Sequence, residues 1–515
     1  MPAHIASLFL DQVLRPIKKD NGKLRNISLM ECVFKFASGV IQDAVRQRCP
    51  PSLDCDAEGL HWTQYGGQPA GPELMLMVHQ GLMKLRPRLA YCSLDAENAY
   101  GAIKRSAMLR GTVRWCPANA PFLACQWSSR SQAWIQTSAC KWEQVTVAEG
   151  TAQGDTSSTL AFSRGLRVAL EESYRRCQEQ AFWVHLPSLV DDLLLVADPG
   201  NVEEALAIVR EELRNIGLEL NLSKCAAYIP ARSQAGEGPD NRITSLPQVS
   251  GGLPALGSAY GGEFESVVGP LAVAAEPATR RLRAAKELAS ECGKYRHGQE
   301  PESSWHASWH LLQRVAAKAL VYDVRTLEPS ASLPLAQELD QAIAAAAKEL
   351  LDVCGHDGWT ADTDQQLQWP SELGGMAFGS AELSARVARL AALGQCLPTA
   401  RRHLRAILPE ATEDEILGAV PLSGADDMLR WLREKWGIEI SATGTIARER
   451  EPRWDLRTDF APLKGLTGTL TRAIQTRQFE DACERHAAAA ARTATAARTA
   501  GRADAVDAAR LRSDA

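Results

Sequence analysis

The residues best suited to chemistry are the adjacent aspartates Asp191 and Asp192, which lie between short apolar runs at positions 189–190 and 193–196. The Leu- and Val-rich runs predict two buried strands joined as a hairpin, with the two carboxylates at its tip. Neighbouring carboxylates repel each other and cannot both be buried in ionised form without a cation. The tip is therefore either an ordinary polar turn facing water or a metal site.

Three other positions, all of them upstream, favour the metal site. Asp95 ends an apolar strand predicted at 89–94, so its carboxylate can point into a cleft, and Tyr100 follows five residues later on a predicted helix. Gln153-Gly154 lies just before another predicted helix. Taken alone, Tyr100 is equally well explained as a core aromatic residue.

A basic hairpin is predicted near the start of the chain. The turn-forming pair Asn21-Gly22 is flanked by Lys18, Lys23 and Arg25. Guanidinium and ammonium groups at such a tip could hold a triphosphate. Basic turns are also common on ordinary protein surfaces, so both interpretations stay open.

The elements that must position these residues have a recognisable order. From Tyr91 to Tyr228 the pattern predicts strand, helix, hairpin, helix, acidic hairpin, helix and strand. This order is typical of a split β-α-β sheet with helices behind it, in an α+β fold. Helical patterns at about 277–292, 304–324, 335–353 and 381–397 predict a largely helical second half, and the Ala/Arg/Thr-rich stretch from His486 onward predicts a flexible tail.

Composition restricts the class of protein. The chain has 515 residues, with 45% hydrophobic and 23% charged residues and a formal net charge of −5, as in ordinary soluble proteins. No apolar run is long enough for a membrane span, and the start lacks the features of a signal peptide, so we expect an intracellular protein, in nucleus or cytoplasm, with no membrane partner. The 13 cysteines show no paired spacing, which argues against a disulfide framework or a zinc ribbon.

With these motifs in view, the chain resembles a reverse transcriptase of the non-LTR retrotransposon type. The resemblance rests on Asp95 with Tyr100, on Gln153-Gly154, on Leu189-Val190-Asp191-Asp192, and on the run from Gly217 to Lys224. It continues more loosely into residues 369–376, which look like a segment found downstream of the thumb in some retroelements. Leu189 and Asn26 depart from residues that the family usually has there.

The resemblance implies a right-hand polymerase and roles for individual residues. Asp95, Asp191 and Asp192 would hold two Mg²⁺ ions, with Mn²⁺ as a possible substitute, for transfer of a nucleotide to a primer 3′-hydroxyl. Tyr100 would exclude a 2′-hydroxyl, and Gln153-Gly154 would let the backbone approach nucleotide and template. Nucleotide contacts would also come from a basic set consisting of Lys18, Lys23, Arg25 and Lys224, although Lys224 could simply pair with a neighbouring acid.

The expected domains are fingers at 1–88, a palm with fingers insertions and primer grip at 89–265, a helical thumb at 266–355, a C-terminal helical region at 356–475 and a low-complexity tail at 476–515. The expected partners are an RNA template, a DNA primer or nicked target DNA, and deoxynucleoside triphosphates, whereas protein partners stay open. Two alternatives remain. One is a truncated or decayed retroelement copy that binds nucleic acid without catalysis, and the other is an RNA polymerase or maturase on the same palm.

Overall fold

The structure is a computed structural model that describes residues 12–18, 24–30, 32–48, 62–128, 131–138, 141–256, 258–260, 270–295, 302–327, 329–351, 361–420, 425–436, 439–440, 446–447 and 466–499. The chain forms two compact units. The first contains residues 1–273 and 399–421, and the second contains residues 274–398 and 422–515. Residues 399–421, which we expected within a C-terminal helical region, therefore belong to the first unit.

The core of the first unit is a five-stranded sheet. Its strand order is β3 (Trp62–Gln64), β7 (Val184–Leu189), β8 (Asp192–Ala197), β4 (Ala90–Leu94) and β9 (Ala226–Tyr228). Strand β8 is antiparallel to both β7 and β4, so β4 and β7 run parallel with β8 between them. This is the predicted split β-α-β arrangement, and the α+β fold class is confirmed.

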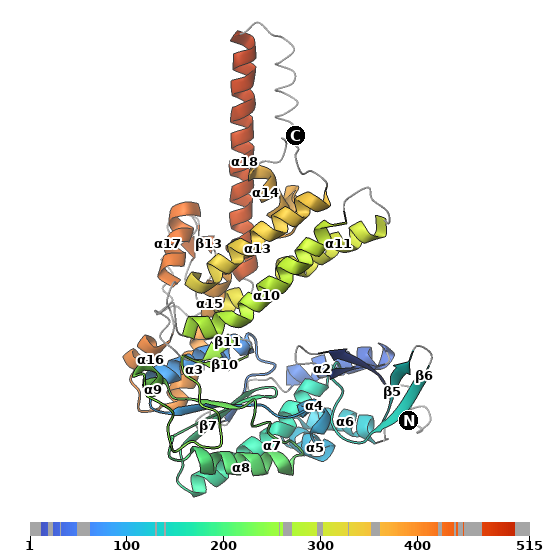
Figure 1. The fold of residues 1–515 in the computed structure, drawn as a ribbon, viewed down its shortest axis with the longest axis vertical. Coiled ribbons are helices and arrows are strands. Elements are labelled where there is room, and N and C mark those ends of the chain that lie inside the picture. Colours follow the sequence, from blue (N-terminus) through green and yellow to red (C-terminus); the bar gives the residue numbers. More distant parts are fainter. Residues whose placement is uncertain are drawn as a thin grey trace. The chain divides into compact units, whose positions relative to one another are not determined.

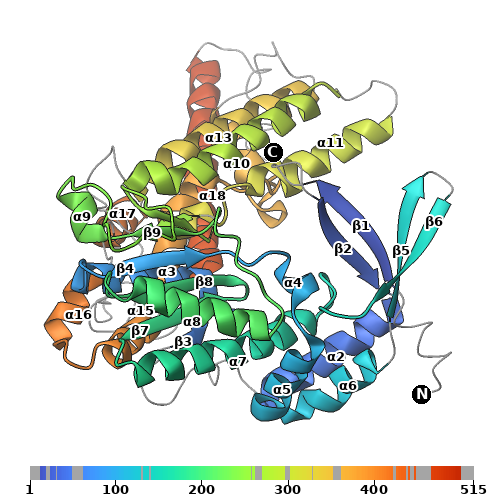
Figure 2. The ribbon, with the colours of Figure 1, turned by 60° about the horizontal axis from the view of Figure 1, so that its bottom comes forward.

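Helices cover both faces of this sheet, which explains why its central strands are rich in apolar residues. Helices α7 (Ser158–Glu179) and α8 (Val202–Asn215) lie side by side on one face, where they bury Cys92, Leu94, Leu193 and Leu195 (Figure 2). Helix α3 (Gly71–Leu85) packs on the opposite face through His79, which contacts His185 of β7. Side chains alternate between the two faces along each strand. Every strand residue except those at the tips is therefore enclosed.

A second, four-stranded sheet lies beside a group of short helices (Figure 2). Its order is β2 (Leu24–Met30), β1 (Gln12–Lys18), β5 (Ser131–Ser138) and β6 (Lys141–Val147). The β1–β2 hairpin confirms the predicted basic hairpin in its backbone pairing. The helices here are α2 (Cys32–Arg48), α4 (Ala99–Ala102), α5 (Arg105–Trp115), η2 (Pro117–Asn119) and α6 (Ala120–Trp127). The predicted order of elements had a single helix before the β5–β6 hairpin, whereas the structure has α4, α5, η2 and α6 there.

Short elements complete the first unit. A two-stranded hairpin, β10 (Leu253–Ala255) and β11 (Ser258–Tyr260), occupies the predicted primer-grip turn. The other helices are α9 (Pro230–Gln234) and α16 (Glu413–Ala419), together with the last turns of α15 (Ala381–Ile407).

The second unit is almost entirely helical (Figure 1). Its elements are α10 (Pro270–Gly293), α11 (Glu302–Arg314), η3 (Ala316–Lys318), α12 (Asp323–Thr326), α13 (Pro329–Leu350), α14 (Ala361–Gln368), η4 (Ser371–Leu373), the first part of α15, α17 (Ala425–Trp436), β12 (Glu439–Ile440), β13 (Ile446–Ala447) and α18 (Leu466–Thr499). None of the described helices has the length and apolar character needed to cross a membrane.

Two features of the second unit bear on the sequence predictions. The segment 369–376 folds as a tight turn in which Gly375 has no room for a side chain, because a Cβ would lie 2.2 Å from the carbonyl oxygen of Trp369. The predicted flexible tail differs from the structure, since α18 continues as a helix to Thr499. From Cys483 to Thr493 this helix is exposed on nearly every face, as expected for a sequence with no core to join.

Candidate active site

The sheet brings the three aspartates of the acidic motifs together. Leu94 of β4 pairs with Leu193 of β8, and the next step of this antiparallel register puts Asp95 opposite Asp192. Asp191 and Val190 form the two-residue turn that joins β7 to β8. Residues facing each other across an antiparallel pair point to the same side of the sheet. Asp95 and Asp192 therefore share the face opposite the α7–α8 layer.

The electrostatics of Asp192 show how close the carboxylates are. Although its side chain reaches solvent at the hairpin tip, partial burial raises its pKa to about 6, with further contributions from the charges of Asp191 and Asp95. Like charges facing each other across a strand pair are unfavourable. A cation placed among these carboxylates would relieve that repulsion.

The run from Gly217 to Lys224 lies along the other side of Asp95. The backbone N–H of Asn221 donates to the Asp95 carbonyl at 2.8 Å, and Ala96 forms a bridge with Leu220. Lys224 Nζ lies 3.0 Å from Asp95 Oδ2. The predicted alternative in which Lys224 pairs with a neighbouring acid is therefore the contact that the structure contains.

The donor set suits a hard divalent cation, although the described residues hold no preassembled metal site. In the part of the chain that the structure describes, no group of three His, Cys, Asp or Glu side chains stands in a metal-binding arrangement. Carboxylate oxygens are nevertheless the ligands that Mg²⁺ prefers. Burial is the main cause of the raised pKa of Asp192, and a cation would relieve the repulsion from Asp191 and Asp95 that adds to it.

Tyr100 is held rigidly beside the acidic residues. Its ring stacks on Phe162 of α7, with centroids 4.9 Å apart and an interplanar angle of 13°. Its hydroxyl lies 3.2 Å from Thr159 Oγ1. Burial raises the pKa of Tyr100, and the charge of Asp191 contributes to the same direction. The ring is therefore near the acidic tip and fixed in orientation by α7.

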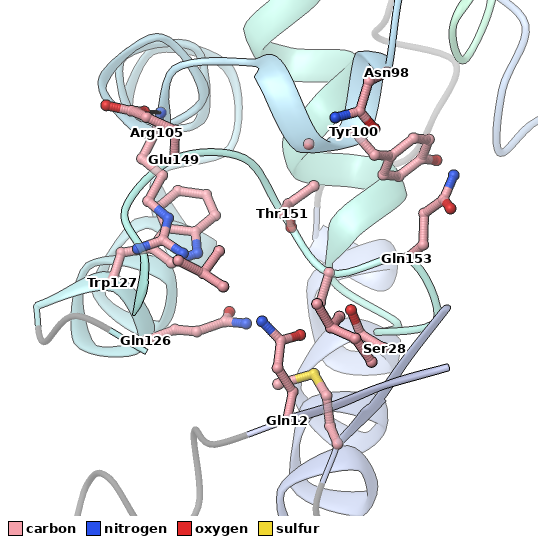
Figure 3. A pocket seen from close by; sticks show the side chains of 15 residues that line it. Gln12, Ser28, Asn98, Tyr100, Arg105, Gln126, Trp127, Glu149, Thr151 and Gln153 are labelled. Atoms are coloured by element: carbon pink, nitrogen blue, oxygen red, sulfur yellow. Dashed lines mark hydrogen bonds between the residues drawn. The ribbon is translucent and has the colours of Figure 1, made fainter. Parts of the chain in front are cut away.

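A pocket opens beside Tyr100 (Figure 3). It has a volume of about 160 Å³. Its lining comes from strands β1, β2 and β6, from helices α4, α5 and α6, and from connecting segments, and it includes Ser28, Asn98, Gln126 and Gln153. Its wall also contains Arg105, whose Nε donates to the Gly150 carbonyl at 3.1 Å. The pocket thus lies between the β1–β2 hairpin and the segment that contains Tyr100.

Gln153-Gly154, in the loop before α7, contacts strand β2 of the four-stranded sheet. The N–H of Ser28 in β2 donates to the Gln153 carbonyl at 2.9 Å. Gly154 has a φ of +111°, and a Cβ there would lie 3.1 Å from the Ser28 carbonyl oxygen. Both the backbone conformation and the close approach require glycine. In the described structure, the close neighbour of Gly154 is strand β2 of the same chain.

Two positioning residues escaped the sequence analysis. Gln64 is buried, and its Oε1 accepts from the N–H of Val190 at 2.6 Å, while its Nε2 donates to Ser188 Oγ at 3.1 Å and to the Val190 carbonyl at 3.3 Å. Val190 has a φ of +58°, which is unusual for a β-branched residue. Gln64 therefore holds the strained residue that directly precedes Asp191.

Asp155 is the second such residue. It is buried and accepts from Ser38 Oγ of α2 at 2.9 Å, from Gln126 Nε2 of α6 at 3.2 Å, and from Ser157 Oγ. These contacts join α2 and α6 to the loop that contains Gly154. The sequence offered no signal for either residue beyond a polar side chain next to a motif, because their partners are distant in the chain.

The basic residues of the predicted site lie at or beyond the limits of the described structure. Lys23 is outside the described residues, and the side chains of Lys18 and Arg25 are outside them as well. Their proposed contact with a triphosphate stays a prediction.

Comparisons with known proteins complete the description. Residues 17–250 match the sequence profile of the family described as reverse transcriptase (RNA-dependent DNA polymerase). No curated protein matches the chain. The fold is similar to apo telomerase from Candida Tropicalis, with 10% identity and a TM-score of 0.41 over 80% of this chain and 69% of that one.

Two further solved structures match with lower TM-scores. Telomerase from Candida albicans in complex with a TWJ fragment of telomeric RNA has 11% identity and a TM-score of 0.37, over 76% of this chain and 65% of that one. Apo telomerase from Candida Tropicalis truncated from its C-terminal domain has 12% identity and a TM-score of 0.30, over 42% of this chain. The alignment with this truncated telomerase spans 50% of its length.

The matched residues include the five-stranded sheet, the four-stranded sheet except for most of β1, and every acidic residue of the candidate site. Residues 17–250 are therefore similar to a reverse transcriptase domain, the domain of RNA-directed DNA polymerases, which are nucleotidyltransferases.

Proposed function

We propose that the chain extends a DNA primer by copying RNA, as the polymerase of a non-LTR retrotransposon-like element. The observation that carries this proposal is the convergence of Asp95, Asp191 and Asp192 next to a fixed tyrosine inside the matched domain. The proposed substrates are an RNA template, a DNA primer or nicked target DNA, and deoxynucleoside triphosphates.

Reverse transcriptases use divalent metal ions, and we propose two Mg²⁺ ions here. Asp95 and Asp191 would hold them, with Asp192 as the third carboxylate. Such ions neutralise the leaving pyrophosphate and make the 3′-hydroxyl nucleophilic. Carboxylate oxygens and the repulsion at Asp192 support this assignment.

The chain's own residues would perform the remaining tasks. Tyr100, stacked on Phe162, would lie under the sugar of the incoming nucleotide and leave no room for a 2′-hydroxyl. Lys224 would orient the Asp95 carboxylate through its contact at 3.0 Å. Gln64 would hold the turn that presents Asp191. Lys18, Lys23 and Arg25 would bind the triphosphate from the fingers.

Primer extension by the purified chain tests the proposal. We expect Mg²⁺-dependent incorporation of deoxynucleotides on an RNA template, and loss of incorporation in Asp191→Asn, which keeps the size of the side chain and removes its charge. A matched control is Asp198→Asn, at an exposed aspartate beyond the end of β8. A wild-type chain that binds primer–template and fails to extend it would indicate a decayed copy.

A further inference from the structure

The helical second unit contains a polar hollow that the reverse transcriptase match does not reach. It measures about 480 Å³ and is lined by α13, α14, α15, α17 and α18. This volume lies within the range of about 300–1,000 Å³ typical of small-molecule pockets. Five of its lining side chains are glutamines, and two are tryptophans. Amides and indoles, rather than charges, therefore dominate its wall.

Two buried polar atoms in this wall lack a hydrogen-bond partner among the described residues. They are the indole donor Nε1 of Trp436 and the amide acceptor Oε1 of Gln365. Buried polar groups are nearly always hydrogen-bonded, and each unsatisfied one is costly. An occupant of this hollow would need to offer both an acceptor and a donor.

Three of the four charged side chains of the wall are engaged with neighbouring groups, and the fourth, Lys435, is exposed and lies 5.2 Å from the ring centroid of Trp436. Asp340 accepts from Ser380 Oγ and from the N–H groups of Ala381 and Glu382, so it caps the start of α15. Arg386 pairs with Glu382 at 3.0 Å and covers the ring of Trp431, 4.9 Å from its centroid. The part of an occupant that enters the hollow is therefore neutral and polar.

The two indole rings provide flat surfaces. Trp431 and Trp436 lie 6.1 Å apart at 76°, so their faces point in different directions. At the end of α17, Arg433 and Lys435 are exposed to solvent. A neutral, planar group with edge donors and acceptors, attached to a phosphate backbone, matches all of these features, since bases stack on aromatic rings and phosphates attract exposed cations.

From this combination we infer that the hollow binds one unstacked base of single-stranded RNA, held by Gln365 and Trp436, with the adjoining phosphates next to the cations of α17. This site is separate from the carboxylates of the first unit, and its occupation does not depend on catalysis. It would give the chain a second contact with a strand of its template.

Photo-cross-linking of the full chain tests the inference. An unstructured single-stranded RNA containing 4-thiouridine is titrated against the protein, and cross-linked peptides are mapped by mass spectrometry. We expect cross-links in the peptide that contains α17. The RNA concentration that gives half-maximal cross-linking there should rise about 2- to 12-fold in Gln365→Met and in Trp436→Phe, as for the loss of one hydrogen bond.

Trp305→Phe is the matched control. The Trp305 indole donates to the Leu350 carbonyl at 3.0 Å, so this substitution removes an indole hydrogen bond within the same unit and outside the hollow. We expect it to lower the melting temperature and leave cross-linking at α17 unchanged. Cross-links confined to residues 17–250, or equal half-saturation in all variants, would overturn the inference. If a free nucleoside monophosphate competed with cross-linking as strongly as unlabelled RNA does, the occupant would be a single nucleotide and not a strand of RNA.

Discussion

Gln64→Met removes the hydrogen bonds that hold the turn before Asp191 and keeps the length of the side chain. The Val190 N–H would lose its acceptor at 2.6 Å, and the Val190 carbonyl would lose its donor at 3.3 Å. A left-handed β-branched residue carries a strain of about 1–3 kcal/mol that only its surroundings maintain. Leaving a buried polar group unsatisfied costs about 1–3 kcal/mol in addition.

We therefore expect Gln64→Met to destabilise the present conformation of the turn by about 2–4 kcal/mol of free energy. If Asp191 must be presented by this turn, catalytic efficiency falls by about 30- to 1,000-fold. Gln64→Glu keeps the acceptor for Val190 and loses the amide donors, so its effect should be intermediate. Steady-state primer extension gives these values, with primer–template affinity measured separately by fluorescence anisotropy.

The control is Gln68→Ala in the same loop. Gln68 Nε2 reaches only the backbone carbonyl of Gln64, at 3.2 Å, and does not contact the turn. We expect Gln68→Ala to keep near wild-type turnover. The reasoning would be refuted if Gln64→Met kept the wild-type turnover number. It would also be refuted if primer–template binding and turnover fell in equal proportion, because Gln64 would then support something other than the turn before Asp191.

Three further predictions concern the same unit. Tyr100→Val should raise the use of ribonucleotides relative to deoxynucleotides by about 5- to 150-fold, because forcing extra atoms into a packed site costs about 1–3 kcal/mol; Tyr100→Phe should leave the ratio unchanged, and an unchanged ratio in both would place Tyr100 outside the sugar pocket. Gly154→Ala should destabilise the first unit by about 1–3 kcal/mol in urea unfolding, because of its positive φ and the nearby Ser28 carbonyl, and an unaltered midpoint would contradict this. Burial lowers the pKa of His79 and of His403 to about 4, below the value of 6.5 in an unfolded chain, so the unfolded state takes up protons first. The contribution of these histidines to the free energy of unfolding should be fully present above about pH 6.5. It should fall toward pH 4 by up to about 1.4 kcal/mol per pH unit for each histidine. His403→Phe should flatten this slope relative to the wild type, and equal slopes would show that His403 is already charged in the folded state.

Much of the local structure was determined by the sequence alone. The Leu- and Val-rich runs around Asp191-Asp192 predicted a hairpin with the carboxylates at its tip, and strands β7 and β8 form it. The apolar run before Asp95 predicted strand β4. These features could be predicted because alternation, turn residues and apolar runs act between near neighbours in the chain. Helix α6 at residues 120–127 was absent from the predicted order of elements, because a short apolar segment suits a strand and a buried helix equally well.

Other features were decided by the tertiary structure. The pairing of β4 with β8 puts Asp95 opposite Asp192, and this register depends on how two distant strands bury their apolar faces. The bonds from Gln64 to Val190 and from Ser38 to Asp155 span 126 and 117 positions. The sequence around a glutamine or a serine does not predict such a distant hydrogen-bond partner. Its role arises only when folding removes both groups from water, because each must then find the other.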